Sequence, residues 1–332
     1  MHGARRRPIE PAFMEAIERP APPAGGWTAS NIVGVDNLSF AEIDYVLALA
    51  EHYAGYLKRG ERPPQRLAGK TQINLFFENS TRTNLSFELA GKKLGADVIN
   101  VPVAASSVNK GEALIDTAQT LGAMGAHVMI IRHSDSAVPA SLAERLDFPV
   151  INAGAGAWEH PTQALLDAAA IRSVHGDLKG LVIAICGDIR HSRVAGSDVR
   201  LFTRLGAEVR FVGPAHLMPD DDQHKDVRRF ASLEEGLAGA DIVMALRMQF
   251  ERMEGDGKVA AQGYFETYGL TYDTLKLAKP GAWVMHPGPM NRGIEIDGAL
   301  ADDPDRSLIL RQVFYGVATR MACLDALLTG GL

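Results

Sequence analysis

Short apolar runs alternate with helical repeats along most of the sequence, and this alternation limits the folds that the chain can adopt. Runs with the length of β-strands lie at 72–77, 97–101, 128–131, 149–151, 181–186, 208–212, 241–246 and 283–286. Apolar residues at helical spacing fill segments between them, such as 112–124 and 162–174. Such alternation is typical of parallel sheets with helices on both faces. The sequence therefore predicts an α/β fold of two similar lobes, joined near 162–174.

This repeat also predicts where the parts of the chain begin and end. We expect a leader, two domains and a C-terminal helix that packs back on the first domain, at 1–28, 29–172, 173–305 and 306–332. The leader is rich in proline and glycine, which predicts a flexible segment without a packed core. Within it, Phe13, Met14 and Ile17 form a short apolar patch in helical register. The leader is therefore either a bare tail or a segment that docks on a partner.

Composition excludes several classes of protein. With 332 residues, 46% of them hydrophobic, the chain can bury a large core. A formal charge of -6 argues against general affinity for nucleic acid or anionic membranes, so any anion site must gather its cations locally. Cys186 and Cys323 give neither a disulfide framework nor a metal-ligand spacing. No apolar run reaches the ~20 residues of a membrane span. Because no apolar core follows Arg5-Arg6-Arg7 as in a signal peptide, we expect a cytoplasmic protein.

The turn after the first apolar run gathers residues that bind anions. That run stops at Phe77-Glu78-Asn79-Ser80-Thr81-Arg82-Thr83. A helical pattern follows and ends at Gly95, with one stripe formed by Leu85, Leu89, Ala90 and Leu94. The hydroxyls and Arg82 thus lie at a helix N-terminus, where backbone N–H groups favour an anion such as phosphate. The alternative is a helix cap beside a surface arginine.

The other strand ends each offer a hydrogen-bond donor, a cation or a rigid turn. In open α/β sheets, ligands bind at the carboxyl ends of the strands. The segments found there are Arg132-His133, His160-Pro161-Thr162-Gln163, Gly187-Asp188-Ile189-Arg190-His191-Ser192-Arg193, Arg247-Met248-Gln249 and His286-Pro287-Gly288-Pro289. One such loop alone is ordinary, and a buried His160 is commonly a structural hydrogen bonder. Their coincidence in both lobes predicts a shared anion-binding site.

A dinucleotide site is a second interpretation of the run 181–186, which Gly187 follows. However, no G-x-G-x-x-G motif is present there, and Arg190 and Arg193 occupy the turn instead. The acidic residue expected at the end of the next strand is also absent, since Phe211-Val212-Gly213-Pro214 stands in its place. The sequence therefore disfavours a nicotinamide-dependent enzyme.

Three motifs, in their order and spacing, resemble the aspartate and ornithine carbamoyltransferase family over roughly residues 30–330. They are Ser80-Thr81-Arg82-Thr83, His160-Pro161-Thr162-Gln163 and His286-Pro287-Gly288-Pro289. The match is closer to the aspartate branch, because ornithine members carry a cysteine in an H-C-L-P element and this chain has Gly288 there. The two carboxylates of aspartate suit Arg193, Arg247 and Lys110, whereas the second amine of ornithine would prefer acidic or polar neighbours.

The resemblance implies transfer of the carbamoyl group of carbamoyl phosphate to the amine of L-aspartate, an early step of de novo pyrimidine synthesis. The first domain would bind carbamoyl phosphate, and the residues implied are Ser80, Thr81, Arg82, Thr83, Arg132, His160, Gln163, Gly288 and Pro289. The second would bind aspartate, and the residues implied are Lys110, Arg193, Arg247 and Gln249. The implied catalytic residues are Arg82, Thr83, Arg132, His160 and Lys110. No metal or redox cofactor is implied, because the leaving phosphate carries the driving force.

Lys110 belongs to the polar loop 106–112, where a lysine is commonly just solvated. In the family, this loop enters the active site of the neighbouring subunit of a homotrimer, together with a serine that is here Ser106 or Ser107. A second loop, 251–258, has charges and glycines and follows Gln249 directly, so we expect it to close on aspartate.

Two further questions stay open at this stage. The alternatives to the aspartate reaction are another amino acceptor, such as ornithine, or a non-catalytic binding homologue. Some bacterial members with N-terminal extensions assemble with dihydroorotase or an inactive relative of it. The leader is therefore a candidate for that contact.

Overall fold

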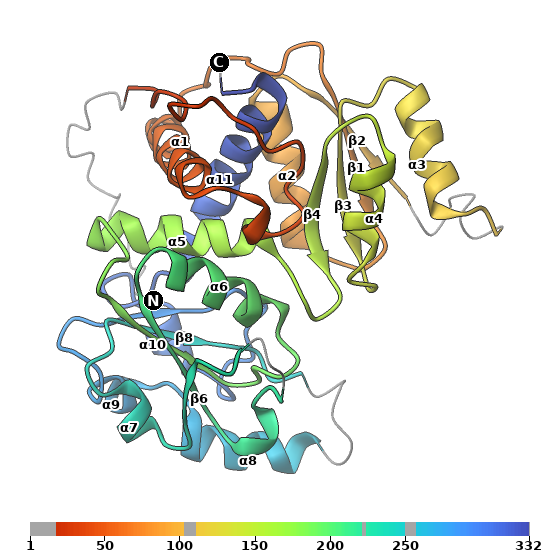
Figure 1. Cartoon of the computed structure of the whole chain (residues 1–332). Helices are drawn as coiled ribbons and strands as arrows, with labels where there is room; N and C mark the ends of the chain where they lie inside the picture. Colours follow the sequence, from red (N-terminus) through yellow and green to blue (C-terminus); the bar gives the residue numbers. More distant parts are fainter. Residues whose placement is uncertain (1–17, 103–110, 221–223, 250–256, 332) are drawn as a thin grey trace, which may run out of the picture.

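Two α/β lobes are present, each built on a parallel sheet, which confirms the predicted fold class (Figure 1). The computed structural model describes residues 18–102, 111–220, 224–249 and 257–331, without the side chains of 257–262. Phe13, Met14 and Ile17 in the leader lie outside the described residues.

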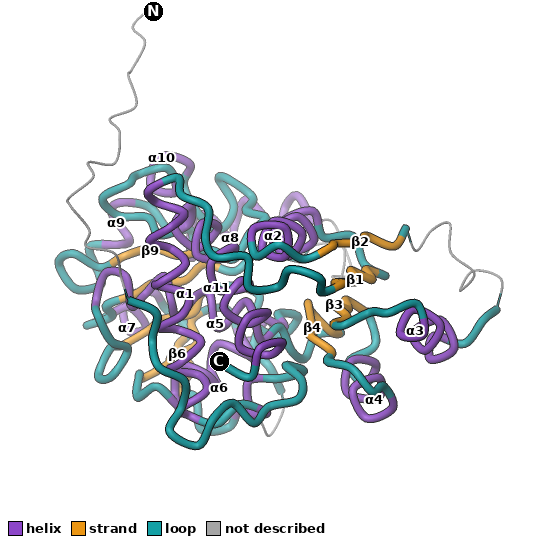
Figure 2. The backbone as a smooth tube through the Cα atoms, turned by 90° about the horizontal axis from the view of Figure 1, so that it is seen from above, coloured by secondary structure: helices purple, strands orange, loops and turns teal. Residues whose placement is uncertain are grey.

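The first lobe contains a four-stranded sheet in the order β2-β1-β3-β4. Its strands are β1 (Thr71–Phe76), β2 (Asp97–Val101), β3 (Val128–His133) and β4 (Val150–Ala155). The helices on its two sides are α1 (Phe40–Arg59) and α2 (Thr81–Lys93), opposite α3 (Leu114–Ala123) and α4 (Val138–Arg145) (Figure 2). Because β1 pairs with both β2 and β3, the chain direction across the sheet reverses at β1.

The second lobe contains a five-stranded sheet in the order β7-β6-β5-β8-β9. Its strands are β5 (Val182–Cys186), β6 (Glu208–Val212), β7 (Arg228–Phe230), β8 (Ile242–Ala245) and β9 (Trp283–Met285). Its helices are α6 (Arg193–Arg204), α7 (Leu233–Leu237), α8 (Gly257–Tyr268), α9 (Tyr272–Leu275) and α10 (Gly298–Ala301). Two 3₁₀ turns lie at Val35–Asn37 and Ala215–Leu217. Here the strand order reverses at β5, which pairs with both β6 and β8.

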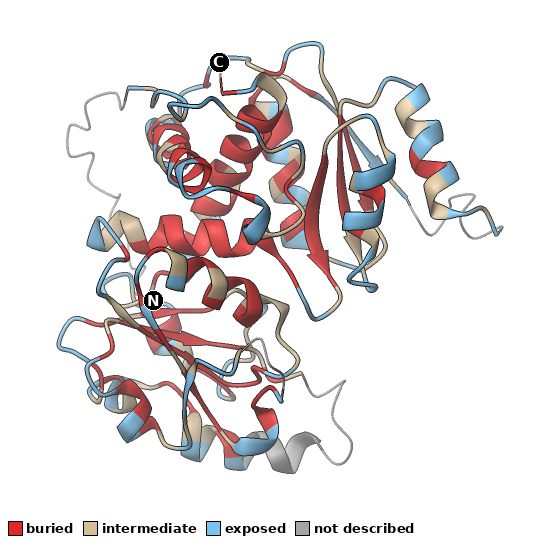
Figure 3. Cartoon of the chain, in the orientation of Figure 1, coloured by how far each residue is buried: buried red, intermediate tan, exposed pale blue. Residues whose placement is uncertain are grey.

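Two helices connect the lobes. Helix α5 (Pro161–His175) leads from β4 into the second lobe, and α11 (Ile309–Thr329) returns to pack against α1, α2 and α5. Both are buried over most of their length, as Figure 3 shows. Burial of this kind fixes the lobes against each other, because interior packing is dense and resists displacement.

Local sequence signals explain most of the elements but not the packing of α2. The expected helix start at Ser39 is a capping box, in which the Ser39 hydroxyl and the Glu42 carboxylate each accept a backbone N–H of the other. In α2, however, Leu85 and Leu89 are 51% and 48% exposed, and Phe87 is buried instead. The stripe that the sequence predicts is therefore only partly buried, through Ala90 and Leu94. Strand β7 was not predicted, because its first two residues are arginines.

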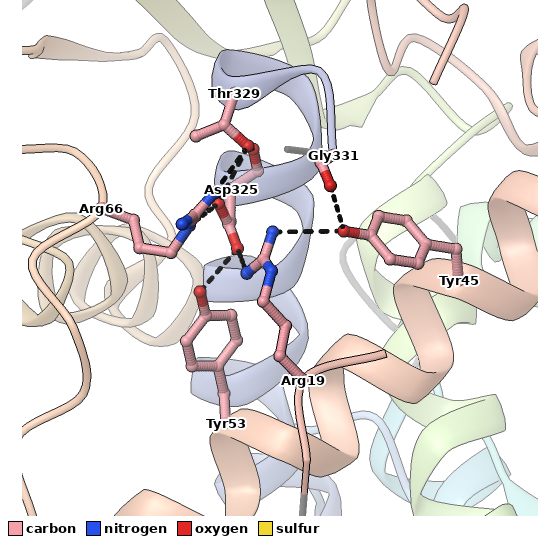
Figure 4. Close-up of polar contacts among 7 residues, drawn as sticks. All are labelled: Arg19, Tyr45, Tyr53, Arg66, Asp325, Thr329 and Gly331. Atoms are coloured by element: carbon pink, nitrogen blue, oxygen red, sulfur yellow. Dashed lines mark hydrogen bonds and ion pairs between the residues drawn. The ribbon is translucent and has the colours of Figure 1, made fainter. Parts of the chain in front are cut away.

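Part of the expected leader is held by an ion-pair cluster on α11 (Figure 4). The buried carboxylate of Asp325 accepts hydrogen bonds from Arg19, from the Tyr53 hydroxyl (2.6 Å) and from Arg66 Nε (2.9 Å). Arg19 also donates to the Tyr45 hydroxyl at 3.2 Å. Burial alone would raise the pKa of Asp325, but these hydrogen bonds hold it below its usual value. Residues 18–28 therefore differ from the flexible segment that composition predicts.

Replacing Arg19 with methionine should lower the melting temperature by roughly 2–6 °C, as expected for losing about 1–2 kcal/mol from one charged, partly exposed hydrogen bond. Differential scanning calorimetry measures this, with Arg228→Met as the matched control, because the Arg228–Glu208 pair is exposed on both sides. Since the folded pKa of Asp325 is lowered, the loss is full above the unfolded pKa and shrinks as pH falls through the folded value. Equal melting temperatures for native and Arg19→Met proteins at neutral pH would contradict a stabilising role for the Arg19–Asp325 contact, which we call the Arg19 anchor.

Candidate active site

The strand order of both sheets places four loops around one cavity. Ligands bind where the strand order of an open α/β sheet reverses. In the first lobe this point lies between β1 and β3, and in the second between β5 and β8. The loops after β1, β5, β8 and β9 line a cavity of about 500 Å³, together with Arg132 in β3 and the start of α5. Its lining includes five arginines and one carboxylate, namely Arg82, Arg132, Arg193, Arg247, Arg320 and Glu78. Such an excess of positive charge favours anionic ligands.

The turn 80–83 presents its hydroxyls and Arg82 at the N-terminus of α2. Ser80 is the N-cap residue, but its hydroxyl makes no capping hydrogen bond. The cap interpretation therefore does not account for Ser80, and the helix N-terminus remains suited to an anion. Partial burial and the charge of Arg247 lower the pKa of Arg82, which indicates that the two arginines lie close together. Arg82 comes from the first lobe and Arg247 from the second.

Arg132 and Arg193 meet across the lobes at one carboxylate. Glu78 Oε2 lies 2.8 Å from Arg193 Nη1 and 3.4 Å from Arg132 Nε. Arg132 Nη1 also donates to the Ala153 carbonyl at 3.0 Å. Burial and the charge of Arg193 lower the pKa of Arg132 to about 10, although Glu78 opposes this effect. Glu78 thus stabilises two arginines that would otherwise repel each other.

Gly154 makes the approach of these two arginines possible. Its φ angle is +120°, and a Cβ there would lie 2.8 Å from Arg132 Nη1 and 3.2 Å from Arg193 Nη1. A larger residue at this position would be strained and would displace at least one guanidinium.

His160 begins α5 as its N-cap residue, and Pro161 occupies the first helical position, as the sequence predicts. The backbone N–H of His160 donates to Ser197 Oγ at 2.8 Å, which ties α5 to α6. Burial and the charges of Arg132, Arg320 and Arg193 lower the pKa of His160 well below its usual value. The imidazole is therefore neutral near pH 7, and it can donate one hydrogen bond without adding charge to the cavity.

In the second lobe, a buried carboxylate supports the cavity wall. Asp188 Oδ1 lies 2.8 Å from His191 Nδ1, and Asp188 Oδ2 accepts the Gln249 N–H at 3.3 Å. Gln249 Nε2 in turn donates to the His191 carbonyl at 2.8 Å. Gly187 permits this loop because its φ is +121°, and a Cβ would lie 2.7 Å from the Leu246 carbonyl oxygen.

The loop 286–289 closes the cavity next to Arg82. His286 Nδ1 accepts the Gly288 N–H at 2.8 Å, so Nδ1 carries no proton, and His286 Nε2 lies 3.1 Å from Glu295 Oε1. Gly288 has φ +69°, and a Cβ there would lie 3.2 Å from Arg82 Nε. The glycine therefore allows the loop to pack against the guanidinium.

The cavity brings together nearly all of the residues singled out from the sequence. Those that line it are Ser80, Thr81, Arg82, Thr83, Arg132, His160, Gln163, Arg193, Arg247, Gln249, Gly288 and Pro289. Lys110, Ser106 and Ser107 lie outside the described residues, as does most of the loop 251–258. His133 does not line the cavity but accepts the Asp135 N–H.

The lining residues to which sequence reasoning assigned no role include Glu78, His191, Gln312 and Arg320. Glu78 and His191 stand in turns that the sequence marks as polar, so their position was visible but their contacts were not. Gln312 and Arg320 lie on α11, far along the chain from the other lining residues. No motif surrounds them, and only the packing of α11 between the lobes brings them to the cavity.

Two other classes of site are not found in the part of the chain that the structure describes. No group of three or more His, Cys, Asp or Glu side chains is arranged to hold a metal ion there. The described helices are also all too short or too polar to cross a membrane.

Comparison with known proteins assigns both lobes to one family. Residues 30–173 match the carbamoyl-P binding domain of the aspartate/ornithine carbamoyltransferases, and residues 179–327 match their Asp/Orn binding domain. The aspartate carbamoyltransferase catalytic subunit of Sphingopyxis alaskensis is 53% identical over 322 residues, covering 96% of this chain and 94% of that protein.

Solved structures give the same result. Aspartate transcarbamoylase from Trypanosoma cruzi, in complex with carbamoyl phosphate and aspartate, superposes with a TM-score of 0.83 at 33% identity. The match covers 94% of this chain and 100% of that one. Ornithine carbamoyltransferase from Pyrococcus furiosus superposes with a TM-score of 0.82 at 27% identity, covering 92% and 99% of the two chains.

Proposed function

The chain belongs to the aspartate/ornithine carbamoyltransferase family, and from this premise we propose that it carbamoylates L-aspartate. The substrates are carbamoyl phosphate and L-aspartate, and the products are N-carbamoyl-L-aspartate and phosphate. The observation that carries the proposal is the cavity between the lobes, where the described lining residues include five arginines and a single carboxylate. A phosphate and a dicarboxylate together supply the negative charge that this cavity lacks. The reaction is an early step of de novo pyrimidine synthesis, which fits a cytoplasmic enzyme.

Carbamoyl phosphate binds in the half of the cavity formed by the first lobe. The residues on its phosphate are Ser80, Thr81, Arg82, Thr83 and Arg132. The carbonyl oxygen accepts hydrogen bonds from Thr83, Arg132 and His160, which strengthen as the tetrahedral intermediate places charge on that oxygen. Gln163 and the backbone of the loop 287–289 bind the carbamoyl NH2 group. This assignment is supported by the anion-binding helix N-terminus of α2 and by the neutral state of His160.

Aspartate binds in the half formed by the second lobe, on Arg193, Arg247 and Gln249, with Lys110 as a further cation. Its α-amine attacks the carbamoyl carbon, and phosphate leaves with the bonding electron pair. Catalysis then depends on positioning and on stabilising negative charge. The choice of aspartate over ornithine is supported by charge, since the described residues of the second lobe that line the cavity include no carboxylate for a second amine. Ornithine or another acceptor is the alternative that the assay must exclude.

Incubation with carbamoyl phosphate and either aspartate or ornithine tests the proposal, with the carbamoylated product measured directly. We expect product from aspartate only. Arg247→Ala should raise the KM for aspartate at least about tenfold, as expected for losing one charge-assisted hydrogen bond of roughly 1.5–3 kcal/mol. Carbamoyl phosphate affinity should change little. Product from ornithine, or an equal loss of affinity for both substrates in Arg247→Ala, would contradict the division of the cavity.

The active enzyme is a homotrimer in which Lys110 acts across a subunit boundary. An apolar surface on the first lobe supports an assembly, since Leu85 and Leu89 on α2 and Ile99 on the edge strand β2 are each about half exposed. A lone soluble chain rarely leaves such a group of large apolar side chains in water.

Mixing two inactive variants tests the shared site. Lys110→Ala and Arg82→Ala trimers should each be inactive, and trimers reassembled from both should recover part of the native activity. Recovery is expected because some interfaces then combine an intact Arg82 with an intact Lys110. Lys58→Ala mixed with Arg82→Ala controls for the handling of the subunits. If demonstrably mixed trimers of the two inactive variants show no recovery, each site lies within one chain.

The leader binds a dihydroorotase or an inactive relative of it through Phe13, Met14 and Ile17. This proposal is supported by the apolar patch in helical register and by the Arg19 anchor, which fixes the chain directly after the patch. Deleting residues 1–17 keeps that anchor, so the trimer should remain folded but no longer co-purify with a dihydroorotase-like chain. A truncated protein that still forms the same larger complex would show that the segment is only a tail.

A further inference from the structure

A buried carboxylate lies directly behind the wall of the cavity, and neither the motifs nor the proposed mechanism uses it. Asp167 is one turn after Gln163 on α5, and its side chain has no exposed surface. Gln163 Nε2 lies 3.0 Å and 3.1 Å from its two oxygens, and Gln312 Nε2 on α11 donates to Oδ1 at 2.7 Å. Gln163 and Gln312 both line the cavity.

The direction of these hydrogen bonds is fixed by a backbone donor. The His286 N–H can only donate, and it donates to Gln312 Oε1 at 3.0 Å. The Nε2 group of Gln312 must therefore point to Asp167. An ionised carboxylate can only accept, so the Gln163 amide must also turn its NH2 group toward Asp167. The carbonyl oxygen of Gln163 is then left to face away from the carboxylate, on the side of the cavity.

The charges around Asp167 are compatible with an ionised carboxylate at slightly alkaline pH. Burial raises its pKa to about 7, while hydrogen bonds from Gln312 and Gln163 and the charge of Arg320 on α11 oppose this effect. Asp198 on α6 is also buried, and burial together with the charges of Asp167 and Glu159 raises the pKa of Asp198 well above its usual value. The charge of Arg320 acts on Asp167 and not on Asp198.

We propose that Asp167 is a positioning residue that turns the Gln163 carbonyl oxygen toward the cavity and so selects phosphates that carry an N–H group. The inference rests on the proposed function, because it assigns the carbamoyl NH2 group to Gln163. A donor on the substrate meets an acceptor on Gln163. An acyl phosphate with a methyl group in that place leaves the acceptor unpaired, which costs binding free energy.

The test compares carbamoyl phosphate with acetyl phosphate, which has a methyl group in place of the NH2 group. Dissociation constants of both are measured at pH 8 by calorimetric titration without aspartate, so that no transfer occurs. The native protein should bind carbamoyl phosphate about tenfold more tightly, as expected for one satisfied rather than unpaired buried hydrogen-bond acceptor.

Asp167→Asn should remove this preference. Gln312 Nε2 donates to Oδ1 at position 167, so Oδ1 remains the oxygen of the asparagine side chain. The asparagine NH2 group then takes the place of Oδ2 and lies opposite the NH2 group of Gln163. Gln163 Nε2 keeps the oxygen Oδ1 at 3.0 Å but meets an NH2 group in place of Oδ2, so the direction of the Gln163 amide is no longer fixed and it can rotate to present a donor to the cavity. The ratio of the two dissociation constants should fall to about one, while the affinity for acetyl phosphate changes less than about twofold.

Asp198→Asn is the matched control, because it makes the same isosteric change one helix away. Neither oxygen of Asp198 has a hydrogen-bond partner among the described residues, so the ratio should keep its native value. A second readout separates positioning from general damage. In a Gln163→Met background, which already lacks the amide, adding Asp167→Asn should leave the ratio unchanged.

If Asp167→Asn does not fold, Gln312→Met tests the same link. It keeps the carboxylate but removes one of its donors, and the ratio should fall by several fold. A folded Asp167→Asn or Gln312→Met protein with the native ratio overturns the proposal, as does a native protein that binds both phosphates equally. A different result would contradict the proposed function. In that case the native protein would prefer carbamoyl phosphate over acetyl phosphate but would not carbamoylate aspartate.

Discussion

The contact on which the site depends is the carboxylate of Glu78 between Arg132 and Arg193. The two guanidiniums come from different lobes, and burial together with the charge of Arg193 lowers the pKa of Arg132. With one carboxylate among five arginines, the cavity carries more positive charge than its walls neutralise. An anion that binds there relieves the repulsion between these cations, which favours its binding.

The helices α5 and α11 hold the two halves of the cavity at a fixed separation. Helix α5 begins at His160 and carries Gln163 and Asp167 on one face, while α11 brings Gln312 to the same carboxylate. Through Gln312, this buried network reaches the backbone of the loop 286–289. In this chain of hydrogen bonds, each hydrogen-bonding group can only donate or only accept. The orientation of every side chain is therefore fixed more precisely than by packing alone. The structure therefore places donors and acceptors for a neutral amide next to the cations that bind phosphate.

Much of the cavity could be predicted from the sequence because its residues follow strands directly. The motifs at 80–83, 160–163 and 286–289 each lie after the end of a strand, namely β1, β4 and β9, and parallel strands bring such ends to one edge. Contacts between distant segments could not be predicted in this way. The Glu78–Arg193 pair spans 115 residues, and the Gln312–Asp167 hydrogen bond spans 145.

The other differences have similar physical causes. Helical periodicity alone does not show which face of α2 is buried, and in the structure Phe87 is buried whereas Leu85 and Leu89 are about half exposed. Composition predicts a flexible leader up to residue 28. It does not show that Arg19 binds the buried carboxylate of Asp325 on α11 and so holds residues 18–28 in place. Both cases depend on which partner surface is available, and that information lies elsewhere in the chain.

In the proposed reaction, one cavity holds the phosphate group and the acceptor carboxylates on different lobes. A crystal structure with N-(phosphonacetyl)-L-aspartate, which joins a phosphonate to an aspartate in one molecule, tests this arrangement most directly. We expect the phosphonate on the turn 80–83 and Arg132, and the carboxylates on Arg193 and Arg247. A ligand bound in the reverse orientation, or outside this cavity, would contradict it.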